Sequence, residues 1–200
     1  MTRDKELDII NEILSGDTDA FEILVEETQS KVYSLALRMT NNQEDARDMA
    51  QEAFIRAFNS LSSFRGDSRF SVWMYRLTSN ICLDFLRQKK RKPADSLTMD
   101  INDDEQDKQF EIPDIRYNPE TELERRELRV LINQGLLELS PDYRQILILR
   151  EINGLSYEEI ADVLKLEPGT VKSRIFRARK KLCSFLLHEG NLPGGFTSNI

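Results

Sequence analysis

The sequence has little of what metal centres and disulfide frameworks require. It contains two cysteines, Cys82 and Cys183, and one histidine, His188, among 200 residues. Each cysteine lies among apolar residues of a predicted helix, so both are expected to be reduced thiols. A multi-histidine metal site is excluded, and no motif places His188 beside a nucleophile and an acid. We therefore expect no metal, no cofactor and no enzymatic activity.

Patterns of membrane-spanning helices and of strands are also missing. No apolar run approaches the length of a transmembrane helix, and Met1 is followed by Thr-Arg-Asp-Lys-Glu where a secretory leader would have a basic stub and an apolar block. No segment shows the sustained alternation of a strand, whereas apolar residues recur at helical spacing through most of the chain. An all-α protein that does not insert into a membrane and resides in the cytoplasm is expected.

The net charge of −7 conceals an uneven distribution of charge along the chain. Residues 65–92 carry eight basic and two acidic side chains, and residues 165–181 carry seven basic and one acidic. Residues 1–64 carry thirteen acidic and six basic, and residues 93–120 carry nine acidic and two basic. The average charge argues against a nucleic-acid partner, but two basic segments in an acidic chain predict two separate DNA contacts.

The chain divides at an Asp-rich segment. Residues 93–122 contain Pro93, Pro113 and Pro119, show no sustained periodicity and follow a run of four cations. We predict a flexible acidic linker over 93–122. The linker separates two small helical domains, 1–92 and 123–188, and residues 189–200 are predicted to be a disordered tail.

Residues 155–182 predict two short helices around a tight turn. Ser156 caps the first helix, and Glu159, three residues on, completes a capping box. The chain then breaks at Pro168-Gly169, where proline suits the first turn of a second helix. One narrow stripe of that second helix is apolar and consists of Val171, Ile175, Ala178 and Leu182. The pattern is typical of a helix-turn-helix.

The opposite side of the second helix combines hydrogen-bond donors, cations and one aromatic ring. Its residues are Gly169, Ser173, Phe176, Arg177 and Lys180, flanked by Thr170 and Lys172. A helix that reads the major groove needs long donors for guanine, an apolar group for thymine methyls and positive charge for phosphates. An ordinary solvated basic face is the alternative, but the preceding capped helix and the tight turn favour DNA binding.

A polar ridge runs along the helix predicted from Asp45 to Leu61. Asp48, Glu52 and Arg56 recur at intervals of four residues, with Gln51 beside them. The ridge is typical of a solvated face supported by the Glu52–Arg56 pair, and a protein-docking surface is the alternative. A third interpretation, a Mg²⁺ site at the two carboxylates, lacks the further acid or nucleophile that it needs.

The segment from Phe64 to Trp73 alternates aromatic rings with cations around a Gly66-Asp67-Ser68 turn. Such alternation suits single-stranded DNA, because bases stack on rings while cations follow the phosphates. Phe70 and Trp73 also fit the core of a helical bundle, which is the favoured position for these two rings. The turn between the rings is then the candidate base pocket.

Together these motifs resemble the extracytoplasmic-function sigma factors of the bacterial sigma-70 family. The resemblance rests on Asp48-Met49-Ala50-Gln51-Glu52-Ala53-Phe54, on Phe64 to Trp73, on Asn80 with Asp84, and on Gly169 to Arg174. It covers both helical parts in the same order, across the linker. It implies an alternative sigma factor that directs core RNA polymerase to specific promoters in a stress or envelope response, with catalysis left to the polymerase.

The resemblance also implies a role for each motif. Region two would dock on the coiled coil of the polymerase's largest subunit through Asp48, Gln51, Glu52 and Arg56. Its loop would hold a flipped base of the minus-ten strand and comprises Phe64, Arg65, Gly66, Asp67, Ser68, Arg69, Phe70 and Ser71. Nearby DNA would meet Asn80, Arg87, Lys89, Lys90 and Arg91. Region four would bind the flap of the second-largest subunit and read the minus-thirty-five groove with Lys172, Ser173, Phe176 and Arg177. Arg174, Arg179 and Lys180 would lie nearer phosphates, and Gly169 and Thr170 would also contact the minus-thirty-five DNA.

The resemblance also implies partners, and two other functions remain as alternatives to it. The resemblance implies core RNA polymerase, promoter DNA and an anti-sigma factor as partners. A helix-turn-helix regulator that acts as a dimer without core polymerase is one alternative, although no dimerisation helix or ligand domain is apparent. A nuclease or recombinase that uses Asp48 and Glu52 with a metal is another, and cleavage of DNA with Mg²⁺ would identify it.

Overall fold

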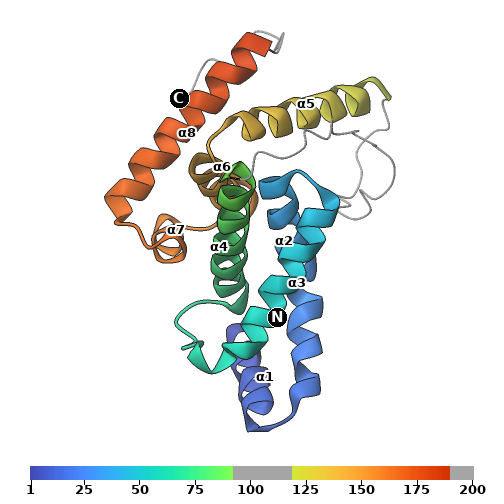
Figure 1. The fold of residues 1–200 in the computed structure, drawn as a ribbon, viewed down its shortest axis with the longest axis vertical. Coiled ribbons are helices and arrows are strands. Elements are labelled where there is room, and N and C mark those ends of the chain that lie inside the picture. The colour runs from blue at the N-terminus through green and yellow to red at the C-terminus, as the bar shows by residue number, and fades with distance from the viewer. Residues whose placement is uncertain (92–118, 190–200) are drawn as a thin grey trace.

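The computed structural model describes residues 1–91 and 119–189, and within these ranges every regular element is a helix (Figure 1). The first range holds α1 (Arg3–Ser15), α2 (Phe21–Thr40), α3 (Gln43–Asn59) and α4 (Phe70–Arg91), with short helices η1 (Thr18–Ala20) and η2 (Leu61–Ser63). The second range holds α5 (Pro119–Glu138), α6 (Pro141–Leu147), α7 (Tyr157–Leu164) and α8 (Pro168–Glu189), with one π-helical turn, η3 (Ile148–Ile152). The predicted all-α class is confirmed.

Two asparagines make the corner between α2 and α3. Asn41 ends α2 in the left-handed conformation, with φ of 53°, which asparagine tolerates better than most residues. Asn42 then caps α3, because its side-chain Oδ1 accepts a hydrogen bond of 2.9 Å from the Asp45 main-chain N–H. The two helices therefore run antiparallel and pack along their length.

Small side chains let α3 lie close to its neighbours α2 and α4. The buried positions of α3 are all alanine and recur with helical spacing: Ala46, Ala50, Ala53 and Ala57. The last three of these alanines share a core with Leu24 and Val32 of α2 and with Phe70 and Met74 of α4, while Ala46 belongs to the cluster shared with the second part. Because one face of α3 is occupied by these alanines, the residues of the opposite face remain at the surface.

The second part is built around an apolar run at the end of α6. Four consecutive residues, Ile146 to Leu149, are buried, and η3 carries the chain onward to α7. Ile160, Ala161 and Val163 are the buried residues of α7, and the predicted stripe of α8 is buried at Val171, Ile175 and Ala178. Leu182, the fourth residue of that stripe, packs against the same cluster while partly exposed.

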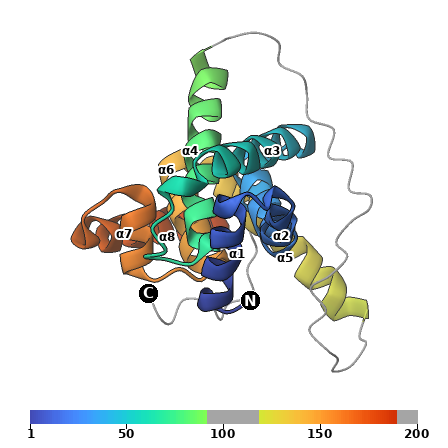
Figure 2. The same cartoon turned by 90° about the horizontal axis from the view of Figure 1, so that it is seen from below.

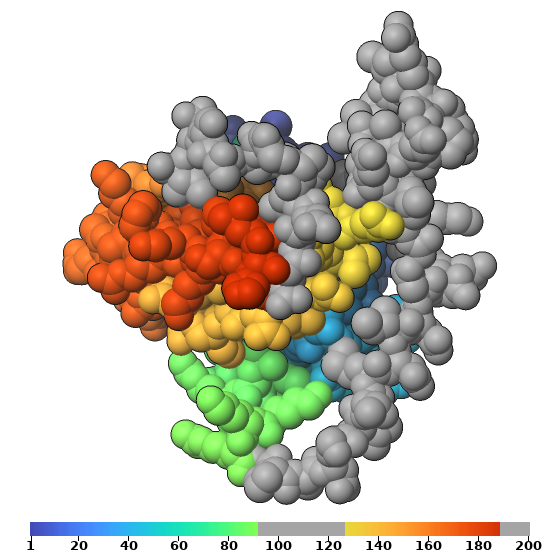
Figure 3. All heavy atoms as spheres, turned by 90° about the horizontal axis from the view of Figure 1, so that it is seen from above, coloured from blue at the N-terminus to red at the C-terminus, as the bar shows by residue number. Residues whose placement is uncertain are grey.

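The two parts pack against each other through α2 and α4. Helix α4 has a second buried stripe, which includes Val72, Tyr75 and Cys82, and these side chains share one apolar cluster with α6 and α7. Seen from above, the carboxyl end of α4 (green) lies against the second part (yellow to orange) (Figure 3). The sequence predicts two domains on a tether, and the structure adds a common core between them.

Some boundaries differ from the sequence-based ones. Helix α5 begins at Pro119, inside the predicted linker of 93–122, and α8 continues through Glu189, one residue into the predicted tail. The remainder of that linker and residues 190–200 lie outside the described residues. None of the helices in the described ranges combines the length and the apolar character that crossing a bilayer requires.

Candidate polymerase and nucleic-acid interfaces

The α3 ridge, consisting of Asp48, Gln51, Glu52 and Arg56, lies on the face of α3 opposite the buried alanines. Asp48, Gln51 and Arg56 are exposed and Glu52 is half-buried. The Arg56 Nε donates to the Glu52 Oε1 at 2.7 Å, and both side chains remain about half exposed, at 53% and 42%. An exposed pair at this spacing contributes only about 0.3–0.5 kcal/mol. The ridge is therefore an ordered polar surface with most of its hydrogen-bonding capacity free for a partner.

The loop before α4 encloses a small cavity on the surface. The cavity has a volume of about 390 Å³, and its walls are Ser63, Phe64, Arg65, Asp67, Ser68, Trp73 and Arg76. Arg65 and Asp67 are exposed, so cation, carboxylate and hydroxyl groups stand around an aromatic wall. An opening with donors, acceptors and a ring is suited to an unstacked base.

Two residues of the predicted minus-ten set are buried in this structure. Phe70 is 1% exposed and packs edge-on against Phe64, with ring centroids 6.0 Å apart, so it supports the loop from within the core. Gly66 is also buried, beneath residues of α1. Trp73 is buried too, in agreement with its favoured position in the core. The exposed members of the predicted set here are Arg65, Asp67 and Arg69.

The basic end of α4 is only partly available for DNA. Lys89 Nζ forms an ion pair of 2.9 Å with Asp45 Oδ2 and lies over the Phe85 ring. Arg87 Nη1 is 3.4 Å from Asp84 Oδ1 on the preceding turn. Lys90 and Arg91 are exposed beside them. Because both cations are largely exposed, solvent screens these pairs and a phosphate can compete for either cation.

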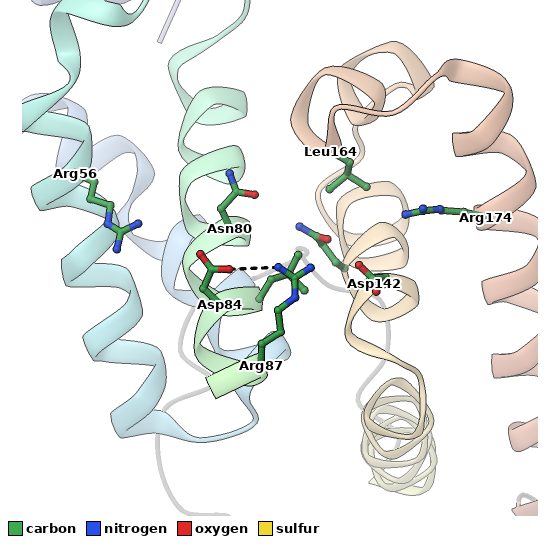
Figure 4. A pocket seen from close by; sticks show the side chains of 9 residues that line it. Arg56, Asn80, Asp84, Arg87, Asp142, Leu164 and Arg174 are labelled. Atoms are coloured by element: carbon green, nitrogen blue, oxygen red, sulfur yellow. Dashed lines mark hydrogen bonds and ion pairs between the residues drawn. The ribbon is translucent and has the colours of Figure 1, made fainter. Parts of the chain in front are cut away.

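A cleft of about 450 Å³ lies between the two parts (Figure 4). The wall formed by the first part contains Arg56 of α3 and Asn80, Asp84 and Arg87 of α4. The opposite wall contains Asp142, Gln145, Leu164 and Arg174. Predicted polymerase-binding, minus-ten and minus-thirty-five residues therefore meet in one cleft. These residues were expected on separate surfaces, and no pattern in the sequence indicates that they lie close together.

The helix-turn-helix forms with the predicted caps. Ser156 Oγ accepts a hydrogen bond of 3.1 Å from the Glu159 N–H, and Glu159 Oε2 accepts one of 2.8 Å from the Ser156 N–H. Lys165 ends α7 in the left-handed conformation, and Pro168 begins α8. This geometry fixes the angle at which α8 leaves the turn, and so fixes the face that α8 presents.

That face of α8 is exposed and basic. Phe176 is 59% exposed, and the exposed residues around it are Lys172, Ser173, Arg177, Arg179 and Lys180. Arg179 donates twice to Glu151 Oε1, at 2.9 and 2.6 Å, so a carboxylate already occupies one predicted phosphate contact. Thr170 and Arg174 are half-buried, and Arg174 lines the cleft. The centre of the face has the donors, cations and apolar ring that a helix needs to read the major groove. At its edges, Arg174 lines the cleft and Arg179 is already bound by Glu151.

Two protein-family models match this chain, one in each of its two parts. The family model Sigma-70 region 2 matches residues 24–92, and the model Sigma-70, region 4 matches residues 129–182. The RNA polymerase sigma-H factor of Pseudomonas aeruginosa is 37% identical over 182 residues, which is 91% of this chain and 94% of that protein. The ECF RNA polymerase sigma-E factor of Escherichia coli (strain K12) is 39% identical over 174 residues, 87% of this chain and 90% of that protein.

Solved structures show the same fold. The structure of CnrH in complex with the cytosolic domain of CnrY has a TM-score of 0.64 at 24% identity and covers 92% of this chain and 98% of that one. The structure of the sigma factor RpoE of Bartonella quintana, in complex with the anti-sigma factor NepR, has a TM-score of 0.61 at 22% identity. The match covers 84% of this chain and 96% of that one.

The chain thus belongs to the sigma-70 family, in its extracytoplasmic-function group. It is an alternative sigma factor, which acts with core RNA polymerase and binds promoter DNA in transcription initiation. Its family consists of initiation factors, and the two matched regions occupy the two packed parts of the fold.

Proposed function

We propose that the protein docks on the coiled coil of the polymerase's largest subunit through the α3 ridge, binds the minus-ten strand with the loop before α4, and reads the minus-thirty-five groove with α8. The observation that carries the proposal is that both family regions occur in one chain, each with its polar contact surface exposed opposite a buried apolar face. The flap of the second-largest subunit is the proposed partner of the second part.

Charge supports the division between protein and DNA partners. The α3 ridge carries two carboxylates and one guanidinium, and a protein partner with complementary charge would be held there. The carboxyl end of α4 and the exposed face of α8 carry cations in excess, as phosphate binding requires. Phe176, a large apolar side chain that stands 59% exposed among those cations, fits a thymine methyl in the major groove.

An anti-sigma factor is a further proposed partner. Two structures with the same fold are complexes, one of CnrH with the cytosolic domain of CnrY and one of RpoE with the anti-sigma factor NepR. We place the promoters of this protein in a stress or envelope response, following the sigma-E names of its relatives. Core polymerase and chromosomal DNA are cytoplasmic, so the proposal places the protein in the cytoplasm.

Run-off transcription with purified core enzyme on a genomic fragment library tests the proposal and yields the promoter sequence. The matched variants are Glu52→Lys, which reverses a ridge charge and removes the pair with Arg56, and Glu26→Lys, an exposed charge reversal on α2. We expect Glu52→Lys to weaken polymerase binding roughly tenfold or more, because like charges across an interface are strongly unfavourable. Glu26→Lys should bind polymerase with an affinity near that of the wild type. Both variants should bind duplex DNA as the wild type does.

Two outcomes would overturn the assignment. If the full chain neither binds core enzyme nor starts transcripts, the docking role of the α3 ridge is wrong. If it binds a palindromic duplex tightly and specifically without polymerase, the regulator alternative is correct.

A further inference from the structure

Helix α1 lies beside the loop that precedes α4, although the region-two family match begins only at residue 24 (Figures 1 and 2). Three of its residues, Arg3, Glu6 and Leu7, contact the loop over a separation of about sixty residues in the chain. None of the three belongs to a motif of the sequence. Each of them engages the loop in a different way.

Glu6 caps α4 from outside that helix. It is buried, at 8% exposure, and its Oε2 accepts a hydrogen bond of 3.0 Å from the main-chain N–H of Phe70, the first residue of α4. The first N–H groups of a helix have no partner within it, and a carboxylate there also meets the positive end of the helix dipole. Arg69, the residue before α4, has no side-chain acceptor to supply such a cap. Glu6 therefore fixes the point where the loop becomes helix.

Arg3 and Leu7 hold the middle of the loop. The Arg3 Nη2 donates to the Gly66 main-chain carbonyl, and Leu7 covers Gly66 so closely that a Cβ there would lie 2.7 Å from its Cδ2. Gly66 also has a φ of +71°, where other residues are strained. The turn is thus shaped by glycine and covered by α1, while Arg65 and Asp67 on either side stay exposed.

We propose that α1 sets the conformation in which this loop receives a base of the minus-ten strand, with Arg3, Glu6 and Leu7 as positioning residues. The inference rests on the proposed function of the loop. All three contacts are made by α1, and none of the three residues lines the cavity, whose walls come from η2, the loop and α4. A loop held in advance loses less conformational entropy when DNA binds, so α1 contributes to affinity and base discrimination without touching the DNA.

The test uses the full chain assembled with core polymerase. The variants are Arg3→Met, which removes only the contact with Gly66, Glu6→Leu, which removes the cap, and Glu6→Gln, which keeps a neutral acceptor. Glu12→Gln, at an exposed position of α1, is the control. The probe is a fluorescein-labelled single strand with the minus-ten sequence found by run-off transcription, compared by anisotropy with a strand substituted at one base.

We expect Glu6→Leu to weaken binding of the matched strand roughly tenfold, the size of a lost hydrogen bond to a charged group, and to reduce discrimination against the substituted strand. The affinity of Glu6→Gln for the matched strand should lie between those of Glu6→Leu and the wild type. Arg3→Met should bind the matched strand several-fold more weakly than the wild type. Binding to core polymerase and to a minus-thirty-five duplex should change by less than twofold in every variant. Glu12→Gln should match wild type throughout.

The only tryptophan of the chain provides an independent readout. Trp73 is 5% exposed and lies 5.3 Å from the Phe64 ring, centroid to centroid, beneath the loop. In the free full-length protein, emission from Trp73 should shift to longer wavelength in Arg3→Met and Glu6→Leu as the loop loosens and water enters. This measurement remains informative even where a variant assembles poorly with polymerase.

The inference is wrong if the α1 variants bind the matched strand as wild type does, or if they lose polymerase binding and strand binding by the same factor, as general destabilisation would cause. Failure of the wild-type holoenzyme to distinguish the two strands would overturn the proposed function of the loop instead. The two failures are therefore distinguishable.

Discussion

The Arg144 guanidinium of α6 donates a hydrogen bond of 2.5 Å to the Met39 main-chain carbonyl at the end of α2, and so joins the two parts of the molecule. The same side chain donates to the carbonyls of Leu136 at 2.9 Å and Leu137 at 2.8 Å, near the end of α5. The last carbonyls of a helix have no partner within it, and a cation suits the negative end of the helix dipole. One buried arginine thus caps two helices that belong to different regions.

Replacing Arg144 with Met should destabilise the protein by roughly 2–5 kcal/mol, because each buried acceptor left without a donor costs about 1–3 kcal/mol. Burial lowers the pKa of Arg144, and the charge of Glu138 opposes that shift. Urea unfolding followed by circular dichroism measures the loss. Arg47→Met, at an exposed position of α3, is the control and should change stability by less than about 0.5 kcal/mol.

The same variant tests the contact between the two parts. With Arg144 removed, α2 and α6 lose their polar connection, so the radius of gyration from small-angle X-ray scattering should increase at temperatures where the helices remain folded. An unchanged radius would mean that the shared apolar cluster and the Arg38–Asn133 hydrogen bond suffice to hold the two parts together.

Cys82 should be nearly inert in the folded protein. Burial raises the pKa of the Cys82 thiol to about 12, whereas Cys183 is partly exposed on α8. Because the thiolate is the nucleophile, iodoacetamide at pH 8 should modify Cys183 rapidly and Cys82 only when the protein unfolds. Cys183→Ser should abolish the fast phase, and modification of Cys82 at the rate of an exposed thiol would contradict its burial.

The raised pKa of the Cys82 thiol also predicts that the stability of the protein depends on pH. The folded-state pKa is raised, so the neutral thiol contributes stability that is complete below the ordinary pKa of 9.0 and is lost as pH rises toward about 12. The free energy of unfolding, measured in urea from pH 8 to pH 10.5, should fall more steeply in the wild type than in Cys82→Ala. Equal slopes would show that other groups cause the decline.

The capping box of α7 should support both stability and DNA binding. Replacing Ser156 with Ala removes the acceptor for the Glu159 N–H and should cost about 1 kcal/mol. Because α7 sets the direction of α8, the free energy of binding to the minus-thirty-five duplex should become less favourable by about the same amount. Ser184→Ala, an exposed hydroxyl near the end of α8, is the control. A loss of stability without any loss of affinity would show that α8 is positioned by its apolar contacts alone.

Local signals in the sequence located the helix-turn-helix well. Ser156, Glu159 and Pro168 each act within a few residues of their own position, and the structure confirms all three. The buried stripe of α8 was equally predictable, because one face of a single helix determines it. The exposed α3 ridge followed from the same periodicity.

Contacts between distant segments could not be predicted in this way. An arginine usually signals exposure, so nothing in the sequence marked Arg144 as a buried cap for two helices. The pairing of Glu6 with Phe70 spans 64 residues and leaves no local pattern. The second stripe of α4, with Val72 and Cys82, was missed because periodicity shows that a face is apolar without showing which element covers it. The burial of Gly66 by Leu7 and of Phe70 by Phe21 likewise depends on contacts with distant segments.

The exposed face of α8 should contain two kinds of contact, which salt dependence can separate. Arg177 has no partner among the described contacts and stands at the centre of the face beside Phe176. Arg177→Ala should cost roughly 1–3 kcal/mol at one base pair and relax specificity there, whereas Lys180→Ala should weaken all sequences alike and reduce the salt slope by about 1. Arg179 is held by Glu151, so Glu151→Gln should strengthen binding to any duplex by freeing that cation. Binding isotherms at several salt concentrations, on a duplex set substituted at each position, measure all three, and a uniform loss for Arg177→Ala would assign it to phosphate.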